Sequence, residues 1–391
     1  MTVGIEEGLE GVVAARTRLS GIDGEEGRLW LGGFPVEELA PKACFEETVH
    51  LLWNGELPDG AQLDALQGQI SGWTLPGGTR SLIEAAVEAG QRPIDLLRLA
   101  LDSLCLEGAG SDVALVGATP VIVAAVSRSM EGKPVIPPDP GLRLAANFLY
   151  MLTGRRPTEA GARALDTYLN TMVDHGMNAS TFTARVITST RSDLKSAVVG
   201  ALGALKGPLH GGAPEPALAM LQEIGVPGRA EPCIRNLLER GERLMGFGHR
   251  EYKARDPRAA VLAQAAEDLC SAEGDRGLLD LAGTVEAEAV RLLEEYKPGR
   301  RLYANAEFYT AVLLHELGVP PELFSSTFAV SRMAGWIAHC REQEAVGRIF
   351  RPQSEYVGRG DGEWVALEER GARTGTATAV SAGPAPDSAL G

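Results

Sequence analysis

The stretch that decides the fold reads Asp193-Leu-Lys-Ser-Ala-Val-Val-Gly-Ala-Leu-Gly-Ala-Leu205, followed by Lys206-Gly-Pro-Leu-His-Gly-Gly-Ala-Pro214. Apolar residues follow Asp193 at helical spacing, and its carboxylate suits a helix N-cap; glycine and proline then break the helix. Short apolar helices ended by Gly or Pro recur along most of the chain, and little sustained two-residue alternation follows the first forty residues. The sequence therefore predicts a mainly α fold.

Other helix boundaries can be predicted from the same signals. Thr158 is an expected N-cap, and Gly176 supplies a left-handed stop for the helix that follows this cap. Asp256, which precedes a proline, and Asn305 are expected caps of two later helices. Thr284 is an expected cap of a helix between them.

Composition is that of a globular protein. The chain has 391 residues, 45% of them hydrophobic, which is enough for a core without cross-links. Its five cysteines are widely spaced and show no C-x-x-C pair, so reduced thiols are expected. The first residues lack the features of a signal peptide or presequence, and the longest apolar run, 113–126, contains Pro120 and is too short to span a bilayer. A cytoplasmic protein without membrane contact is expected.

The net charge of -15 excludes nucleic acid as the main partner, because phosphate binding needs a basic field. If the ligands are small anions, arginines and lysines must gather locally against this charge. Such clusters occur near residues 249–258 and 332–351.

The end of the chain, residues 371–391, consists mostly of Ala, Gly, Thr, Ser and Pro. Such a composition cannot bury enough apolar surface to order itself. We expect a disordered tail there, and we find no internal repeat in the chain.

His210 and His249 both fall in glycine-rich breaks between predicted helices, where side chains can face a cleft. A single histidine in this setting is more often a capping or core residue, but two in matching settings favour a functional site. No His and carboxylate pair has the short spacing of a zinc site, so no metal is expected. The glycine-rich loops match no phosphate-binding loop, and no G-x-S-x-G elbow is present.

Glu307 and Arg332 are further candidates. Glu307 is expected in the first turn of a helix, where the macrodipole keeps a carboxylate ionised, although acids are common there without any function. Arg332 shares one face with Phe328 and Trp336 in a helix expected from Pro321 to about residue 342. A guanidinium on an apolar face needs either a structural salt bridge or a ligand carboxylate, and the sequence leaves both open.

Longer motifs stand in a fixed order. They read Asp174-His-Gly-Met-Asn-Ala-Ser-Thr-Phe-Thr183, Lys206-Gly-Pro-Leu-His-Gly-Gly212, Met245-Gly-Phe-Gly-His-Arg-Glu-Tyr-Lys253 with Asp256-Pro-Arg258, and Arg351-Pro-x-x-x-Tyr-x-Gly358. With Phe45-Glu-Glu-Thr48 and Ser331-Arg-Met-Ala-Gly-Trp-Ile-Ala-His339, they resemble the motifs of the citrate synthase family from about Gly8 to Gly358.

The resemblance implies a nearly all-helical homodimer in which a small domain closes over the substrates. The large domain would comprise residues 1–211 and 319–370, and the small domain residues 212–318. The expected activity joins acetyl-CoA, as a substrate rather than a cofactor, to oxaloacetate.

The resemblance also implies roles for single residues. His210 would donate to the thioester oxygen, Glu307 would remove a proton from the acyl carbon, and His249 would polarise the ketone. The oxaloacetate carboxylates would contact His175, Arg258, Arg332 and, from the other subunit, Arg351. CoA would contact Lys253, Gly246, Phe247 and Gly248.

Three positions depart from the family pattern. Glu307 stands where Asp is usual, Pro214 replaces Asn, and Gly176 replaces Glu. The extra methylene of Glu307 moves the carboxylate by about an ångström, which matters for proton transfer. Alternatives are therefore a 2-methylcitrate synthase that uses propionyl-CoA, and a non-catalytic paralogue that binds CoA or a dicarboxylate. A purely structural helical protein would have no need for Arg332 on an apolar face.

Overall fold

The computed structural model describes residues 7–9, 11–106, 108, 110–211, 214–358, 360 and 362–370, so the predicted tail lies outside the described residues. The chain divides into two compact units, residues 1–349 and 350–391. All predicted site residues except Arg351 belong to the first unit. The predicted division into a large and a small domain stays a prediction.

The first unit is mainly α-helical, which confirms the predicted fold class. Its described strands, β1 (Ser20–Asp23), β2 (Arg28–Leu31) and β3 (Phe34–Pro35), form one antiparallel sheet with Ser20 opposite Leu31. The helices are α1 Val36–Leu39, α2 Phe45–Asn54, α3 Gly60–Ser71, α4 Gly77–Glu88, α5 Pro93–Asp102, α6 Ser111–Met130, α7 Leu144–Thr153, α8 Glu159–Met172, α9 Ala179–Ser189, α10 Leu194–Leu205, α11 Pro214–Ile224, α12 Ala230–Glu239, α13 Pro257–Glu273, α14 Gly277–Tyr296, α15 Ala306–Glu316 and α16 Phe324–Val346.

Four of the predicted N-caps are confirmed by hydrogen bonds to the first helical turn. Thr158 caps α8 by accepting from the backbone N–H of Gly161, and Asp193 caps α10 by accepting from that of Ser196. Asp256 and Asn305 cap α13 and α15 in the same way. These side chains satisfy backbone donors that have no partner inside the helix, so local sequence is enough to place them.

The predicted cap at Thr284 is wrong. α14 begins at Gly277, so Thr284 lies in its interior, where its hydroxyl donates to the carbonyl of Asp280 at 3.0 Å. A threonine inside a helix can bond to the carbonyl four residues earlier, which removes the need for a cap. The buried residues Leu279 and Leu281 hold the helix start against its neighbours.

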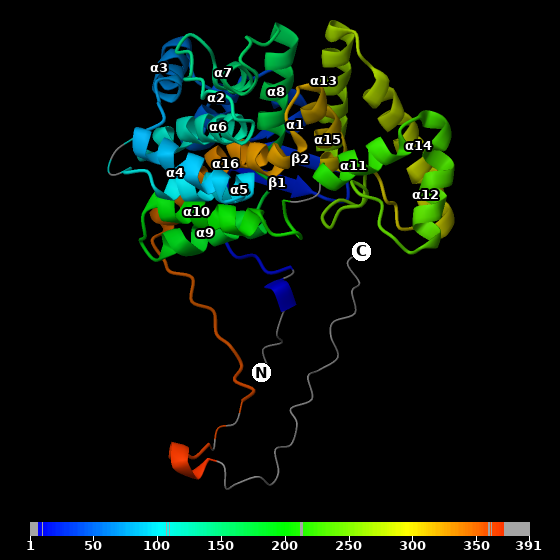
Figure 1. The fold of residues 1–391 in the computed structure, drawn as a ribbon. Helices are drawn as coiled ribbons and strands as arrows, with labels where there is room; N and C mark the ends of the chain where they lie inside the picture. The colour runs from blue at the N-terminus through cyan, green and yellow to red at the C-terminus, as the bar shows by residue number, and fades with distance from the viewer. Residues whose placement is uncertain are drawn as a thin grey trace. The chain divides into compact units, whose positions relative to one another are not determined.

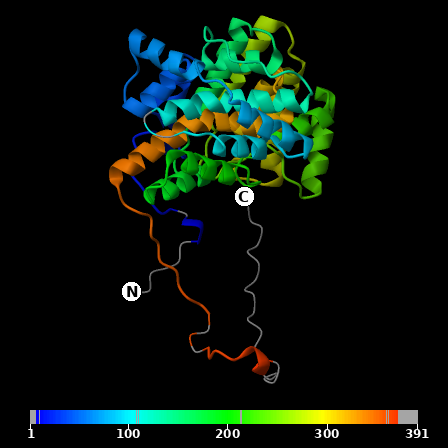
Figure 2. The ribbon, with the colours of Figure 1, turned by 60° about the vertical axis from the view of Figure 1, so that its left-hand side comes forward.

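α16 is central to the first unit. It packs against α6, α8, α9 and α10, and in both ribbon views it lies between α6 and the pair α9 and α10 (Figure 1, Figure 2). It starts at Phe324, after a 3-10 turn at Pro321–Leu323, and runs slightly past the predicted end. Its predicted stripe is buried, with Arg332 only 3% exposed. A charged group thus lies in the middle of the helical core.

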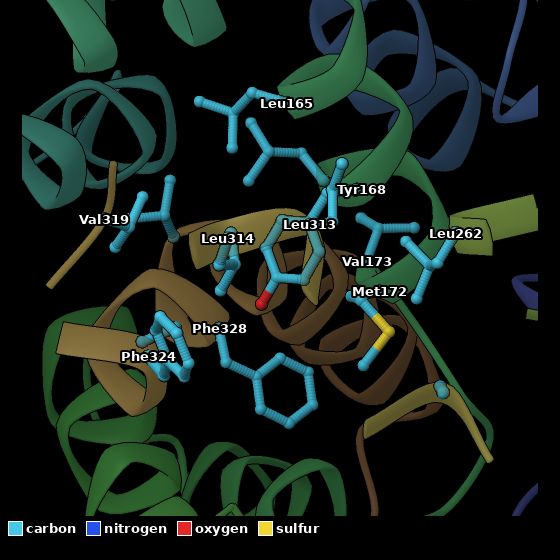
Figure 3. Close-up of a cluster of buried hydrophobic side chains, with 14 of the residues drawn as sticks. Leu165, Tyr168, Met172, Val173, Leu262, Leu313, Leu314, Val319, Phe324 and Phe328 are labelled. Atoms are coloured by element: carbon cyan, nitrogen blue, oxygen red, sulfur yellow. The ribbon is translucent and has the colours of Figure 1, made fainter. Parts of the chain in front are cut away.

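The core beside this arginine is built by helices that are far apart in sequence. Figure 3 shows Tyr168 from α8, Leu314 from α15 and Phe328 from α16 converging in one cluster. The cluster also contains Leu262 of α13. Helices from both predicted domains therefore share one apolar core around the candidate site.

α6 contains the apolar run at 113–126. By length and composition this helix could cross a membrane, but 78% of its most apolar window is buried inside the protein. Soluble proteins often bury such a helix in their core, as the sequence predicts here.

Candidate active site

Two of the candidate histidines, His175 and His249, lie on separate loops that contact each other. His175 follows the end of α8, and His249 lies between α12 and α13; their ring centroids are 5.4 Å apart. Nε2 of His175 is 3.0 Å from the hydroxyl of Tyr252, which belongs to the second loop. Burial, helped by the charges of Arg258 and Arg332, holds the pKa of His175 well below its usual value. The two loops therefore bring the rings of His175 and His249 and the hydroxyl of Tyr252 together.

The hydrogen bonds of His249 determine which ring nitrogen carries hydrogen. Its Nδ1 accepts from the backbone N–H groups of Glu251, at 3.0 Å, and Tyr252, at 3.4 Å. Because an accepting nitrogen carries no hydrogen, the neutral ring has its hydrogen on Nε2. Burial and the charge of Arg258 lower the pKa of His249 to about 4, so the ring is neutral at pH 7.

Nε2 of His249 also lies 3.1 Å from a guanidinium nitrogen of Arg258. A guanidinium can only donate, and the neutral ring accepts at one nitrogen only, so with Nδ1 accepting from the loop backbone the Arg258 N–H and the Nε2–H are both donors without an acceptor at this point. An acceptor oxygen that approaches both groups satisfies both, as a ketone or carboxylate oxygen does. The pair therefore forms a recognition point for an oxygen-rich anion.

Asp256 holds Arg258 in place. Its two oxygens accept from Nε and Nη2 of Arg258 at 3.0 and 2.9 Å. The same carboxylate accepts from the backbone N–H of Ala306, at the start of α15, at 3.0 Å. Arg258 is thus fixed relative to the helix that carries Glu307.

His210 lies between α10 and α11, next to the start of α9. Its Nε2 is 3.3 Å from the backbone nitrogen of Ser180, which donates to it, and 2.8 Å from the Ser180 hydroxyl. That hydroxyl also contacts Asn178 and accepts from the indole of Trp336. Burial and the charge of Arg332 lower the pKa of His210 to about 4. The ring is therefore neutral, with its hydrogen on Nδ1 available to a ligand.

Glu307 lies in the first turn of α15, as predicted. Its Oε2 atom is buried and has no hydrogen-bond partner among the described residues. Burial raises the pKa of Glu307 to about 7, against the opposing effect of the positive charges of Arg258 and Arg332. A carboxyl group of this kind can take up and release a proton near neutral pH.

Arg332 lies opposite these groups on α16. Its Nε and Nη1 atoms are buried without a hydrogen-bond partner in the described part of the chain, and its guanidinium lies 4.9 Å from the ring centroid of Phe328. Burial lowers the pKa of Arg332 to about 10, although the group stays charged at pH 7. Of the two possibilities that the sequence leaves open, the structural salt bridge is not formed among the described residues, although the negative charges of Asp174 and Glu307 lie near enough to favour the charged form of Arg332. A ligand anion remains as the partner that this charge needs.

The glycine loop before His249 is pinned to the start of α15. Phe247 bridges to Ala304, and the backbone N–H of Gly248 donates to the carbonyl of Tyr303 at 2.8 Å. The carbonyl of Gly246 accepts from the backbone N–H of Asn305 at 2.9 Å. The loop is therefore positioned by the same helix that carries Glu307.

Two predicted contacts are not tested by the geometry of the first unit. Lys253 is exposed, and its backbone N–H donates to the carbonyl of Gly24. Arg351 is exposed in the second unit. Their predicted contacts with CoA and with oxaloacetate stay predictions.

Sequence reasoning missed four residues that shape the site. Asp256 orients Arg258, Ser180 orients His210, and Tyr252 contacts His175. Tyr168 places a buried hydroxyl, without a hydrogen-bond partner among the described residues, near the charges of Glu307 and Arg332. Ser180, Tyr252 and Asp256 lie in the family-like motifs, but local sequence does not reveal which distant groups Ser180 and Tyr252 contact.

The described residues include no group of three or more His, Cys, Asp or Glu side chains that could hold a metal ion. The site instead consists of neutral histidines, buried arginines and one carboxyl group with a raised pKa. These features define a mainly α-helical protein in which buried positive charges lie beside a carboxyl group whose pKa is near neutral.

Comparison with known proteins identifies the class. The family model described as "Citrate synthase, C-terminal domain" matches residues 8–353. The chain is 37% identical over 383 residues to a citrate synthase of Haloferax volcanii, covering 94% of this chain and 99% of the relative. It is also 37% identical over 361 residues to a 2-methylcitrate synthase of Shewanella oneidensis, covering 90% and 94%.

A solved structure agrees with these relatives. The citrate synthase of Thermoplasma acidophilum, in a ternary complex with carboxymethyl coenzyme A and oxaloacetate, superimposes with a TM-score of 0.84 at 31% identity, covering 94% of this chain and 100% of that one. The chain belongs to the citrate synthase family. The predictions of an enzyme of this family and of its fold are confirmed.

Proposed function

We propose that the chain is a citrate synthase that condenses acetyl-CoA with oxaloacetate and water to give citrate and CoA. The observation that carries the proposal is the buried guanidinium of Arg332, two of whose nitrogens lack hydrogen-bond partners in the described part of the chain, next to a carboxyl group with a pKa of about 7. The carboxyl groups of Asp174 and Glu307 lie near this charge but make no hydrogen bond to Nε or Nη1 among the described residues, so an anion in the site would supply the missing acceptors. A dicarboxylate with a ketone supplies the anion and the electrophile together.

In the proposed first step, Glu307 removes a proton from the methyl carbon of acetyl-CoA. The Nδ1–H of His210 donates to the thioester oxygen and stabilises the enolate as it forms. One such donor contributes about 3 kcal/mol to transition-state stabilisation, and a positioned base adds about a hundredfold in rate or more. The pKa of His210 supports this role: at about 4 it keeps the ring neutral at pH 7, so the hydrogen bond comes from the Nδ1–H of an uncharged imidazole.

In the second step, the enolate carbon forms a bond with the ketone carbon of oxaloacetate. The Nε2–H of His249 polarises the ketone and supplies the proton that its oxygen takes up; before the next turnover His249 regains a proton from water and Glu307 releases the one it removed. Arg258, Arg332 and His175 hold the carboxylates. Water then hydrolyses the thioester, which releases CoA as a thiol and makes the overall condensation irreversible.

The remaining contacts extend the same proposal. Lys253 and the loop at 246–248 hold CoA, and Arg351 of the partner subunit completes the oxaloacetate site in a homodimer. CoA takes part as a substrate, and the reaction uses no metal or cofactor. The protein acts in the cytoplasm, without nucleic acid or membrane partners. A verified monomeric variant is expected to lose oxaloacetate affinity, and normal affinity in such a monomer contradicts the role of Arg351.

The departures from the family pattern are compatible with activity. Pro214 is the first residue of α11, a position where proline needs no backbone N–H. Glu307 lies in the same first turn that an aspartate would occupy, and its raised pKa suits a base at neutral pH. Neither departure removes a group that the chemistry needs, which argues against a non-catalytic paralogue.

A 2-methylcitrate synthase that uses propionyl-CoA is the second candidate. The relative from Shewanella oneidensis, at 37% identity, is as similar in sequence as the citrate synthase of Haloferax volcanii. The two activities differ by one methylene in the acyl pocket, which changes binding by about 1–3 kcal/mol. Comparing the two thioesters directly distinguishes them.

The test measures thiol release with a thiol-reactive dye, from acetyl-CoA and from propionyl-CoA, each with and without oxaloacetate. Wild type should release CoA only with oxaloacetate, and Glu307→Ala should lose this release by about a hundredfold or more. Glu322→Ala, which changes an exposed carboxylate on a nearby turn, is the matched control and should behave as wild type. Folded wild type that binds both substrates but releases no thiol would support the binding paralogue.

A further inference from the structure

The hairpin formed by β1 and β2 contains none of the predicted site residues, yet it contacts both loops that carry the oxaloacetate histidines. We infer that this hairpin positions the two loops relative to each other, with Ser20 and Gly24 as positioning residues for oxaloacetate. The inference rests on the proposed function, because it assumes that His175 and His249 contact this substrate.

The first contact fixes the His175 loop. The hydroxyl of Ser20 donates to Oδ2 of Asp174 and accepts from the backbone N–H of Gly176 at 2.9 Å. Asp174 and Gly176 flank His175 on both sides. Asp174 is 1% exposed, and its other oxygen accepts from Nε2 of His339 at 3.1 Å. One hydroxyl of the hairpin thus contacts the side chain before the histidine and the backbone N–H after it.

The second contact fixes the His249 loop. The turn of the hairpin approaches this loop so closely that the carbonyl of Gly24 accepts from the backbone N–H of Lys253 at 2.8 Å. A Cβ atom on Gly24 would lie 1.9 Å from the carbonyl oxygen of Glu251. Because real Cβ atoms do not approach backbone oxygens this closely, any side chain at residue 24 must push the loop away.

The peptide groups of this loop determine the orientation of His249. The backbone N–H of Glu251 donates to Nδ1 of His249, which places the ring hydrogen on Nε2. Tyr252, the next residue, contacts His175 at 3.0 Å. Displacement of the Glu251 peptide therefore changes the orientation of the His249 ring and of its Nε2–H, and it weakens the contact between Tyr252 and His175. The effect on oxaloacetate passes through these residues, and the hairpin itself need not touch the ligand.

A purely structural role for the hairpin predicts a different result. It predicts loss of folding stability and similar changes for both substrates. A positioning role predicts a selective loss of oxaloacetate binding in a protein that remains folded. The two are separated by measuring the Kd for oxaloacetate, the KM for each substrate and the thermal midpoint on the same variants.

The main variant is Gly24→Ala in the full-length protein, with oxaloacetate binding measured by isothermal titration calorimetry. We expect the Kd for oxaloacetate to rise tenfold or more, with the KM for acetyl-CoA, at saturating oxaloacetate, within about twofold of wild type. Gly21→Ala is the matched control on the same hairpin, because its Cβ would lie 3.6 Å from a ring carbon of Trp30, an ordinary contact. It should bind oxaloacetate within about twofold of wild type.

A second pair keeps the test decisive if Gly24→Ala fails to fold. Ser20→Ala removes the hydroxyl that holds the His175 loop and should weaken oxaloacetate binding severalfold, whereas Ser20→Thr retains a hydroxyl and should restore most of it. Wild type that fails to bind oxaloacetate contradicts the proposed function. Wild type that binds, with Gly24→Ala or Ser20→Ala unchanged, overturns the positioning role alone. Equal losses in Gly24→Ala and Gly21→Ala also overturn it.

Discussion

Two buried arginines on neighbouring helices, Arg185 of α9 and Arg332 of α16, differ in their hydrogen-bond partners: among the described residues only Nη2 of Arg185 is unpaired, whereas both Nε and Nη1 of Arg332 are. Arg185 is fully buried and donates to Glu342 at 2.9 Å, to Nδ1 of His339 at 3.0 Å and to Gln343 at 3.2 Å. Arg332 is almost as buried, but its Nε and Nη1 atoms lack partners among the described residues.

This difference separates a structural charge from a ligand-binding one. Removing a buried charge from a paired network leaves its partners unsatisfied, whereas removing an unpaired charge relieves the core. The hydrogen-bond partners, rather than the burial, therefore favour a structural role for Arg185 and the proposed binding role for Arg332. Replacing each arginine by methionine, and comparing the loss of activity with the loss of stability, tests this distinction.

The largest effect is expected from Arg332→Met. Oxaloacetate-dependent thiol release should fall by about a thousandfold, equivalent to about 4 kcal/mol, because a buried charged contact to the ligand is lost. The free energy of unfolding, measured in urea, should stay the same or rise. Full activity, or a large loss of stability, would place Arg332 in the same class as Arg185.

Arg185→Met should show the reverse pattern. Its removal leaves Glu342 and His339 without their shared donor, so the free energy of unfolding should fall by about 3 kcal/mol. The KM for oxaloacetate should change far less than in Arg332→Met. Denaturant titration and steady-state kinetics on the same preparations provide the check, and an unchanged midpoint at constant slope contradicts the structural role.

A smaller effect is expected from a pair of changes at His339, which accepts from Arg185 and donates to Asp174. Glutamine can make both contacts with its amide, and leucine can make neither. His339→Leu should lose about 2 kcal/mol of folding free energy, and His339→Gln should recover most of it. Equal losses in the two variants would mean that packing, rather than hydrogen bonding, maintains this network.

The smallest effect concerns pH and the carboxyl group beside Arg332. Glu307 must be ionised to accept a proton, and its pKa is about 7. Below this pH, kcat/KM should fall about tenfold per unit, because the protonated form is inactive as a base. His210 and His249, whose pKa values are about 4, remain neutral between pH 5 and 7 and add no second loss there. Arg185→Met should give the same profile; a flat wild-type profile contradicts the role of Glu307.

The sequence predicts local structure well where the determining groups are neighbours in the chain. The caps at Asp193 and Asn305 bond to backbone groups within three residues, so their chemistry is visible in a short window. Thr284 has the same residue type as a cap, but tertiary packing of the preceding turns extends the helix past it. Propensity at a single position cannot anticipate this packing.

The sequence is enough to predict which residues are candidates for the site, but only part of how they are arranged in space. Arg332 is visible on its apolar stripe, but the sequence cannot show whether a carboxylate from elsewhere reaches it. His339 and Asp174 meet across 165 residues, and Ser20 and Asp174 across 154. Nothing in local sequence specifies these pairings, because they follow from how the helices pack. The network that orients the site therefore appears only in the folded structure.

The carboxylate of Asp256 has a consequence for the order of folding. Its bonds to Arg258 span two residues and can form as soon as α13 starts, whereas its bond to the backbone of Ala306 spans 50 residues. A nascent chain that has not yet reached Ala306 lacks this donor. Arg258 can therefore be oriented locally at an early stage, but it becomes fixed relative to the proposed base only after α13 and α15 have docked.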